Sequence, residues 1–66
     1  MNEERSVHLA VRRYVRLYGM SERQATAYTL STRGYTISSI ALRMGIRDGT
    51  VMTHLYNARR KRSGLQ

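Results

Sequence analysis

The sequence predicts an all-α domain of four helices. Apolar residues recur at helical spacing along the chain, residues that favour helix N-caps precede these segments, and glycines follow several of them. The chain has no proline to interrupt a helix and no cysteine for a disulfide or a thiolate metal site. With 66 residues, it is expected to form one compact domain with a thin core, divided into an N-terminal helical part (1–19) and a second part (20–66).

The first helix is predicted to span Glu3–Tyr18. Asn2 is a favourable N-cap, and Gly19 is expected to end the helix. Glu3 and Glu4 stabilise the positive end of the helix dipole. The apolar stripe consists of Val7, Val11, Tyr14 and Tyr18, flanked by Ala10 and Leu17. We expect this stripe to complete the core of the domain, to form a homodimer interface, or to do both.

The second helix is predicted to start at Ser21 with a capping box. In this motif the Ser21 hydroxyl accepts a hydrogen bond from the backbone amide of Gln24, whose side chain accepts from the Ser21 amide in return. The apolar face consists of Ala27, Tyr28 and Leu30, and Gly34 is expected to stop the helix.

The third and fourth helices are predicted to form a helix-turn-helix. The third is expected over Ile37–Met44, capped by Thr36 and closed by Gly45, and the fourth over Asp48–Arg62. Ala41 permits a close helix crossing, and Gly45 permits the left-handed backbone that a tight turn needs. The apolar residues expected to form the core of this unit are Ile40, Met44, Ile46, Val51, Leu55 and Ala58.

The chain is strongly basic, with a formal charge of +8 that is unevenly distributed. Residues 31–66 carry seven of the twelve basic residues and one of the four acids. Eleven of the basic residues are arginines, whose planar guanidinium binds phosphate and guanine through paired hydrogen bonds. This distribution predicts a polyanionic partner such as nucleic acid.

Residues 20–62 resemble the LuxR-type (GerE-type) DNA-binding domain. The residues that carry the resemblance are Met20-Ser21-Glu22-Arg23-Gln24, Gly34, Thr36, Ile40-Ala41, Thr50-Val51, His54 and Asn57. Gly49-Thr50-Val51, Leu55 and Ala58-Arg59 are also similar to the recognition helix of the promoter-reading C-terminal domain of sigma factors. The resemblance implies a LuxR/sigma-like helix-turn-helix that reads double-stranded DNA, here with an extra N-terminal helix.

The chain departs from the LuxR-type pattern at several positions. Ile37, Ser38 and Ser39 stand where that family usually has Asn-Lys-Glu, and Met52 replaces a common lysine. Arg47 occupies the place of the usual serine cap, so Asp48 is expected to cap the fourth helix instead. The additional helix precedes the motif, whereas the family normally has a dimerising helix after it.

The fourth helix is expected to place one side in the core and the opposite side in the DNA major groove. The expected base contacts are Arg47, Asp48, Gly49, Met52, Thr53 and Tyr56. Arg47 is placed to bind guanine, and Met52 and Tyr56 are placed to meet thymine methyl groups. The expected phosphate contacts are Arg33, Thr36, Ser38, Arg43, Thr50, Arg59, Arg60, Lys61 and Arg62. For the terminal basic run, a solvated helix end is the alternative.

Together these features predict a sequence-specific, double-stranded-DNA-binding transcription regulator. We expect it in the cytoplasm, at the nucleoid, as a homodimer through helix 3–18 that reads half-sites about one DNA turn apart. A sigma-like module that binds RNA polymerase or a sigma factor is the alternative. A nonspecific nucleoid or RNA binder is a third possibility, although the tyrosines fit core positions better than single-strand stacking platforms.

Other classes of function find little support in the sequence. No nucleophile–base pair stands out, so we do not expect an enzyme, and no cofactor or small-molecule ligand is implied. His8 and His54 lack cysteine partners and metal-ligand spacing, so no metal site is expected. No apolar run approaches the roughly 20 residues that span a bilayer. The acidic N-terminus has no apolar signal core, and we expect no membrane partner.

Overall fold

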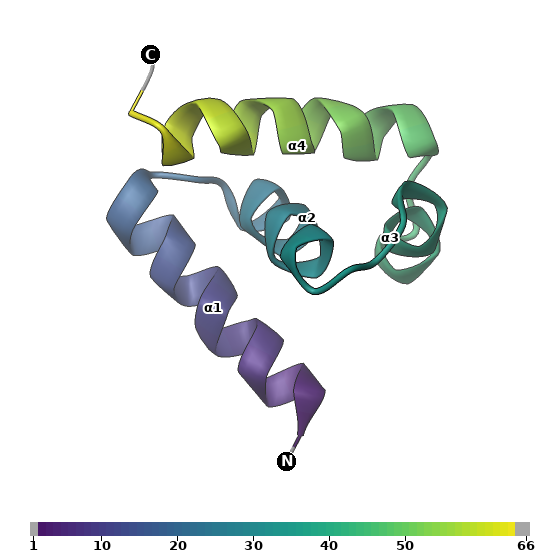
Figure 1. The fold of residues 1–66 in the computed structure, drawn as a ribbon, viewed down its shortest axis with the longest axis horizontal. Coiled ribbons are helices and arrows are strands. Elements are labelled where there is room, and N and C mark those ends of the chain that lie inside the picture. Colours follow the sequence, from purple (N-terminus) through teal and green to yellow (C-terminus); the bar gives the residue numbers. More distant parts are fainter. Residues whose placement is uncertain (1, 65–66) are drawn as a thin grey trace.

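The fold is described here from a computed structural model of residues 2–64, which form four α-helices: α1 (Glu3–Tyr18), α2 (Glu22–Thr32), α3 (Ile37–Met44) and α4 (Asp48–Arg62). Helix α2 is central and packs against the other three, with α4 across one side and α1 and α3 at its flanks (Figure 1). The predicted all-α, four-helix fold is confirmed. The predicted bounds of α1, α3 and α4 are those of the structure, whereas α2 begins one residue after Ser21 and ends before Gly34.

Side-chain caps explain where three of the helices begin, including α3, where Thr36 Oγ1 accepts from the Ser39 amide at 3.1 Å. Asn2 Oδ1 accepts from the Glu4 amide at 2.9 Å, which starts α1. At the start of α2, Ser21 Oγ accepts from the Gln24 amide at 3.1 Å and Gln24 Oε1 accepts from the Ser21 amide at 3.0 Å. These bonds satisfy backbone amides that lack partners within the helix, so they fix the first turn of each helix.

The N-terminus of α4 differs from the sequence prediction. Arg47, not Asp48, is the N-cap residue, and no side chain within residues 2–64 caps this helix. The Asp48 carboxylate instead accepts a hydrogen bond from the Ser38 hydroxyl at 3.1 Å. The expectation that Asp48 caps the helix was wrong because Asp48 already belongs to the first helical turn, where its charge stabilises the helix dipole without capping an amide.

The core lies around α2 and comprises two adjoining clusters. One joins α2 to the helix-turn-helix and consists of Ala27, Leu30, Ile40, Ala41, Val51 and Leu55. The other joins α1 to α2 and α4 and consists of Val11, Met20, Ala25 and Ala58. Tyr14 meets Tyr28 edge-to-face with ring centroids 5.1 Å apart, which adds aromatic packing between α1 and α2. The apolar stripe of α1 therefore contributes to the core of its own chain.

The turn between α3 and α4 depends on one glycine. Gly45 has φ 68°, in the left-handed region that side chains disfavour. The next amide, that of Ile46, donates to the Ala41 carbonyl at 3.0 Å and closes the helix end. This reversal brings α4 back across α2 and fixes which side of α4 is buried. Within residues 2–64, no helix is long and apolar enough to cross a bilayer.

Candidate nucleic-acid interface

The side of α4 opposite the core is exposed along the first half of the helix. Val51, Leu55 and Ala58 are at most 3% exposed and anchor one side of the helix. All six predicted base-contact residues are exposed: Arg47, Asp48, Gly49, Met52, Thr53 and Tyr56. Helix α4 forms the upper edge of the molecule in Figure 1. The structure therefore brings the predicted residues together on one accessible surface, which we call the α4 surface.

Tyr56 and Arg60 form a pair that extends the α4 surface by one turn. The Arg60 guanidinium lies 5.6 Å from the centre of the Tyr56 ring, and its Nη1 donates to the tyrosine hydroxyl at 3.1 Å. Tyr56 is 59% exposed, so the pair is formed on the surface and not in the core. A guanidinium held against an aromatic ring keeps its remaining donors free for an external acceptor.

The N-terminal end of the α4 surface combines a cation with a carboxylate. Arg47 is exposed, immediately before the first turn of α4. Asp48 follows it and accepts from Ser38 across the helix-turn-helix. Thr53 is exposed and donates its hydroxyl to the Gly49 carbonyl at 3.2 Å. These groups offer a donor, an acceptor and apolar contacts over a short stretch of helix.

The predicted phosphate contacts divide into two groups along the chain. Five residues lie at or near the helix-turn-helix: Arg33, Thr36, Ser38, Arg43 and Thr50, all of them exposed. Four others, Arg59, Arg60, Lys61 and Arg62, lie in the last turn of α4. Several of these side chains already have partners within the chain, which separates the nine into freer and more constrained residues.

Two members of the terminal basic run are engaged inside the domain. Lys61 Nζ donates to the Gly19 carbonyl at 3.1 Å and to Gln24 Oε1 at 2.9 Å. The Arg62 guanidinium lies 4.8 Å from the centre of the Tyr18 ring. Both contacts fasten the end of α4 to the corner between α1 and α2, so these two cations have a packing role that their sequence position did not reveal.

Two of the arginines near α3 are also oriented by neighbours. Arg33 Nη2 donates to Ser6 Oγ at 2.9 Å, which links the end of α2 to α1. Arg43 lies 5.0 Å above the Tyr35 ring, and the Tyr35 hydroxyl donates to Glu3 Oε1 at 2.9 Å. This hydrogen bond to the Glu3 carboxylate raises the pKa of the Tyr35 hydroxyl above its usual value. Tyr35, in the loop between α2 and α3, therefore bridges α1 and α3.

Sequence reasoning missed one exposed apolar side chain on the helix-turn-helix. Leu42 of α3 is 84% exposed. Helical spacing could have predicted this exposure, because Ile40, Ala41 and Met44 form the inner side of this short helix and leave Leu42 on the opposite side. His54 shows the opposite mismatch, a buried polar atom: its Nε2 is buried and has no hydrogen-bond partner within residues 2–64.

A short α3, a glycine turn and a second helix with a basic, exposed outer side define a helix-turn-helix domain of the DNA-binding class. The family model for sigma-70, region 4, matches residues 14–61. That match covers most of the chain, and the chain belongs to the sigma-70 region 4 family. The match confirms the sigma-like part of the resemblance found in the sequence. It does not confirm the LuxR-type part. No curated protein and no solved structure matches the chain.

Proposed function

We propose that this chain is a sequence-specific, double-stranded-DNA-binding transcription regulator that reads the major groove with α4. The exposed α4 surface is the observation that carries the proposal. A helix anchored along one side and free along the other is how helix-turn-helix domains present side chains to base edges. Membership of the sigma-70 region 4 family and the positive charge around the motif support the same function.

Arg47 is the residue we expect to contribute most to base preference. It precedes α4 and is exposed, so its guanidinium is free to bind O6 and N7 of a guanine. Met52 and the Tyr56 ring supply apolar contacts suited to thymine methyl groups. Asp48 and Gly49 lie between these groups, where the carboxylate suits a cytosine amine and the glycine permits close approach of the backbone.

Phosphate contacts on both sides would hold α4 in register. Arg59 is the stronger candidate, since it is exposed in the last turn of α4, whereas Arg43 is also exposed but lies over the Tyr35 ring. Arg33, Thr36, Ser38, Thr50 and Arg60 are the further candidates. Lys61 and Arg62 are held by contacts within the chain, so we expect them to contribute chiefly through long-range attraction.

Selection of bound duplexes from a random pool tests the proposal. We expect an enriched motif and a steep loss of affinity with salt, since each phosphate contact adds about 0.9 to the slope of log affinity against log salt. R47A should then relax one base preference, at a cost of about 1–3 kcal/mol of discrimination. R16A removes the same charge from the exposed side of α1 and is the matched control. No enriched motif, or a motif that R47A leaves intact, would refute this reading.

A homodimer on two half-sites is the assembly we propose for the DNA-bound state. Val11 of α1 is buried within its own chain, so a pairing contact would use a different part of the surface from the stripe expected over helix 3–18. The same selection tests this point. A repeated half-site about 10 base pairs apart supports two copies, and a single half-site with a one-to-one complex on DNA counts against them.

Binding to RNA polymerase or a sigma factor is the second candidate function. Membership of the sigma-70 region 4 family favours it, and Leu42, 84% exposed on the outer side of α3, is an apolar side chain that the core does not use. Purified polymerase and a purified sigma factor are the probes, and L42S is the test variant. We expect L42S to weaken such binding and to leave duplex DNA binding intact; equal binding by both forms would remove the observation that favours this function.

A further inference from the structure

The outward side of α1 carries an arginine-rich surface with exposed leucines. Its residues are Arg5, Leu9, Arg12, Arg13, Arg16 and Leu17, which we call the α1 surface. Leu9 is 61% exposed and Leu17 is 66% exposed. Neither leucine contributes to the core, which takes the opposite side of α1 through Val11. The α1 surface is thus a second functional candidate, separate in the fold from the α4 surface (Figure 1).

Two open grooves run along the α1 surface and adjoin one another. One is lined by α1 residues around Leu9 and by Arg33 from the end of α2. The other is lined by Leu9, Arg12, Arg13, Arg16 and Leu17. Because Leu9 and Arg13 line both, the grooves form a continuous surface. Leu9 and Leu17 are eight residues apart, which places them about 12 Å apart along the helix at 1.5 Å per residue.

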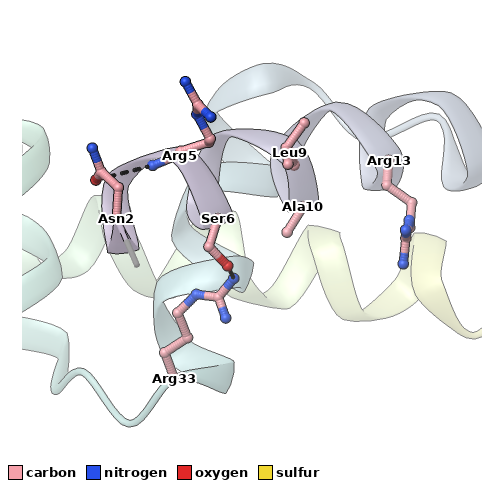
Figure 2. Close-up of a pocket in the computed structure, with 7 residues that line it drawn as sticks. All are labelled: Asn2, Arg5, Ser6, Leu9, Ala10, Arg13 and Arg33. Carbon is pink, nitrogen blue, oxygen red and sulfur yellow. Dashed lines mark hydrogen bonds between the residues drawn. The ribbon is translucent and has the colours of Figure 1, made fainter.

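Arg33 gives the first groove a fixed wall. Its guanidinium donates to the Ser6 hydroxyl at 2.9 Å, so the side chain is held against α1. Figure 2 shows Arg33 reaching toward Ser6 from α2, with Leu9 and Ala10 between Arg5 and Arg13 along α1. The result is an apolar strip with guanidinium groups around it and one cation opposite the helix.

We infer that the α1 surface binds an acidic, leucine-bearing helical segment of a partner protein. Leucine-like side chains about two turns apart on such a segment would cover Leu9 and Leu17, and flanking carboxylates would pair with the surrounding arginines. Charge complementarity carries the choice of partner. The inference goes beyond DNA reading and does not depend on it, because it uses no residue of the α4 surface and shares only Arg33 with the candidate phosphate contacts.

The same observations disfavour other occupants. A second copy packed through this surface about a two-fold axis would set the arginines of one chain against those of the other. A nucleic-acid duplex would engage the arginines but would leave Leu9 and Leu17 without apolar partners. A flat lipid surface would not fill the groove between α1 and Arg33. An acidic amphipathic helix would use the arginines, the two exposed leucines and the groove together.

A designed peptide tests the inference on the full chain. The probe is a fluorescent helical peptide of about 16 residues with glutamates on its flanks and leucines at a spacing of two turns. We expect it to bind and to shift the amide resonances of α1 more than those of α4. A second peptide with alanines in place of the leucines keeps the charge, and we expect it to bind at least about tenfold more weakly.

Matched variants of the chain locate the binding surface. We expect L9S with L17S, and separately R12E, to weaken peptide binding by about tenfold or more. L42S and R59E make the same chemical changes elsewhere and should leave peptide binding within about threefold. Because Leu9 and Leu17 are exposed, L9S/L17S should keep the circular dichroism spectrum and the DNA affinity of the unmodified chain. Failure of the DNA-binding proposal and failure of this inference can therefore be told apart.

Three results would overturn the inference. Equal binding of the alanine peptide would show attraction by charge alone. Equal weakening by R12E and R59E would show that the peptide senses the net charge of the chain and not the α1 surface. Displacement of the peptide by random duplex DNA or by vesicles of phosphatidylglycerol, together with shifts in the α1 amides, would assign this surface to nucleic acid or lipid instead.

Discussion

The Ser38 hydroxyl donates a hydrogen bond of 3.1 Å to the Asp48 carboxylate and joins the first turn of α3 to the first turn of α4. This contact sets the two helices of the motif against each other at their N-terminal ends. It also places the carboxylate of Asp48, the one acidic side chain of residues 31–66, at the N-terminal end of the α4 surface. Asp48 therefore combines a structural contact with an electrostatic effect on any phosphate that approaches.

Substitution D48N should separate those two effects. Asparagine still accepts from Ser38 but removes the charge, so we expect tighter binding to random duplex and a stability loss of about 0.3–1 kcal/mol from the weaker helix-dipole interaction. Anisotropy titrations across salt concentrations and thermal unfolding measure the two quantities. S38A is the control, because it removes the hydrogen bond and keeps the charge; a similar gain in affinity for S38A would contradict the electrostatic explanation.

Arg47 stands at an N-cap position where its side chain makes no capping bond. R47S should therefore stabilise the fold by about 1 kcal/mol, because the serine oxygen would accept from an amide of the first turn of α4. For a domain of this size that gain corresponds to a Tm increase of about 4–8 °C. The same substitution should abolish one base preference. R47A cannot cap the helix and should lose the preference without the gain in Tm; an unchanged Tm in R47S would contradict the prediction.

Lys61 and Arg59 carry the same charge two residues apart but should respond differently to replacement. K61M removes the hydrogen bonds to the Gly19 carbonyl and Gln24, so we expect a stability loss of about 1–2 kcal/mol. R59M should leave stability unchanged and lower the salt slope of DNA binding by about 0.9. Chemical denaturation and salt titrations distinguish the two variants, and the opposite pattern would show that Lys61 acts on DNA and not on packing.

The bond from Tyr35 to Glu3 predicts a stability change at alkaline pH. Because this bond raises the pKa of Tyr35 in the folded chain above its value in the unfolded chain, its contribution is present below the unfolded pKa near about 10 and is lost as pH rises through the folded pKa. We expect Y35F to unfold with a smaller decrease in Tm between neutral pH and pH values above about 10. E3A removes the acceptor of this bond and should behave similarly. A pH dependence unchanged in both variants would contradict the assignment.

Thr29 is 1% exposed, and its hydroxyl oxygen has no hydrogen-bond partner within residues 2–64. T29V keeps the β-branched shape and removes the unsatisfied group, whose burial costs about 1–3 kcal/mol. We therefore expect T29V to raise the Tm. T29S keeps the hydroxyl and should not raise it. A lower Tm for T29V would show that the hydroxyl has a partner in solution.

Local signals in the sequence were enough to predict most of the fold. N-cap residues and terminating glycines placed the ends of α1 and α3, and the spacing of Val51, Leu55 and Ala58 identified the exposed side of α4. That spacing also brought the candidate base contacts together on one surface. Their contact with DNA stays a prediction.

The parts that sequence did not predict depend on contacts between distant segments. Tyr35 reaches a carboxylate 32 positions away, and Lys61 reaches a carbonyl 42 positions away. Such contacts follow from how the helices pack, which spacing along the chain does not determine. The same applies to Leu17, whose flanking position on the α1 stripe is exposed because α2 and α4 cover the other side of α1.

The tyrosines have a consequence for observing this molecule by optical methods. The chain has no tryptophan, so its five tyrosines supply the intrinsic ultraviolet fluorescence. Tyr14, Tyr18 and Tyr28 are packed together between α1 and α2, whereas Tyr56 lies on the α4 surface beside Arg60. Emission from the packed group reports loosening of α1, and emission from Tyr56 reports a ligand at α4. A Y56F chain used beside the unmodified one would therefore separate the emission of Tyr56 from that of the other four tyrosines without any attached label.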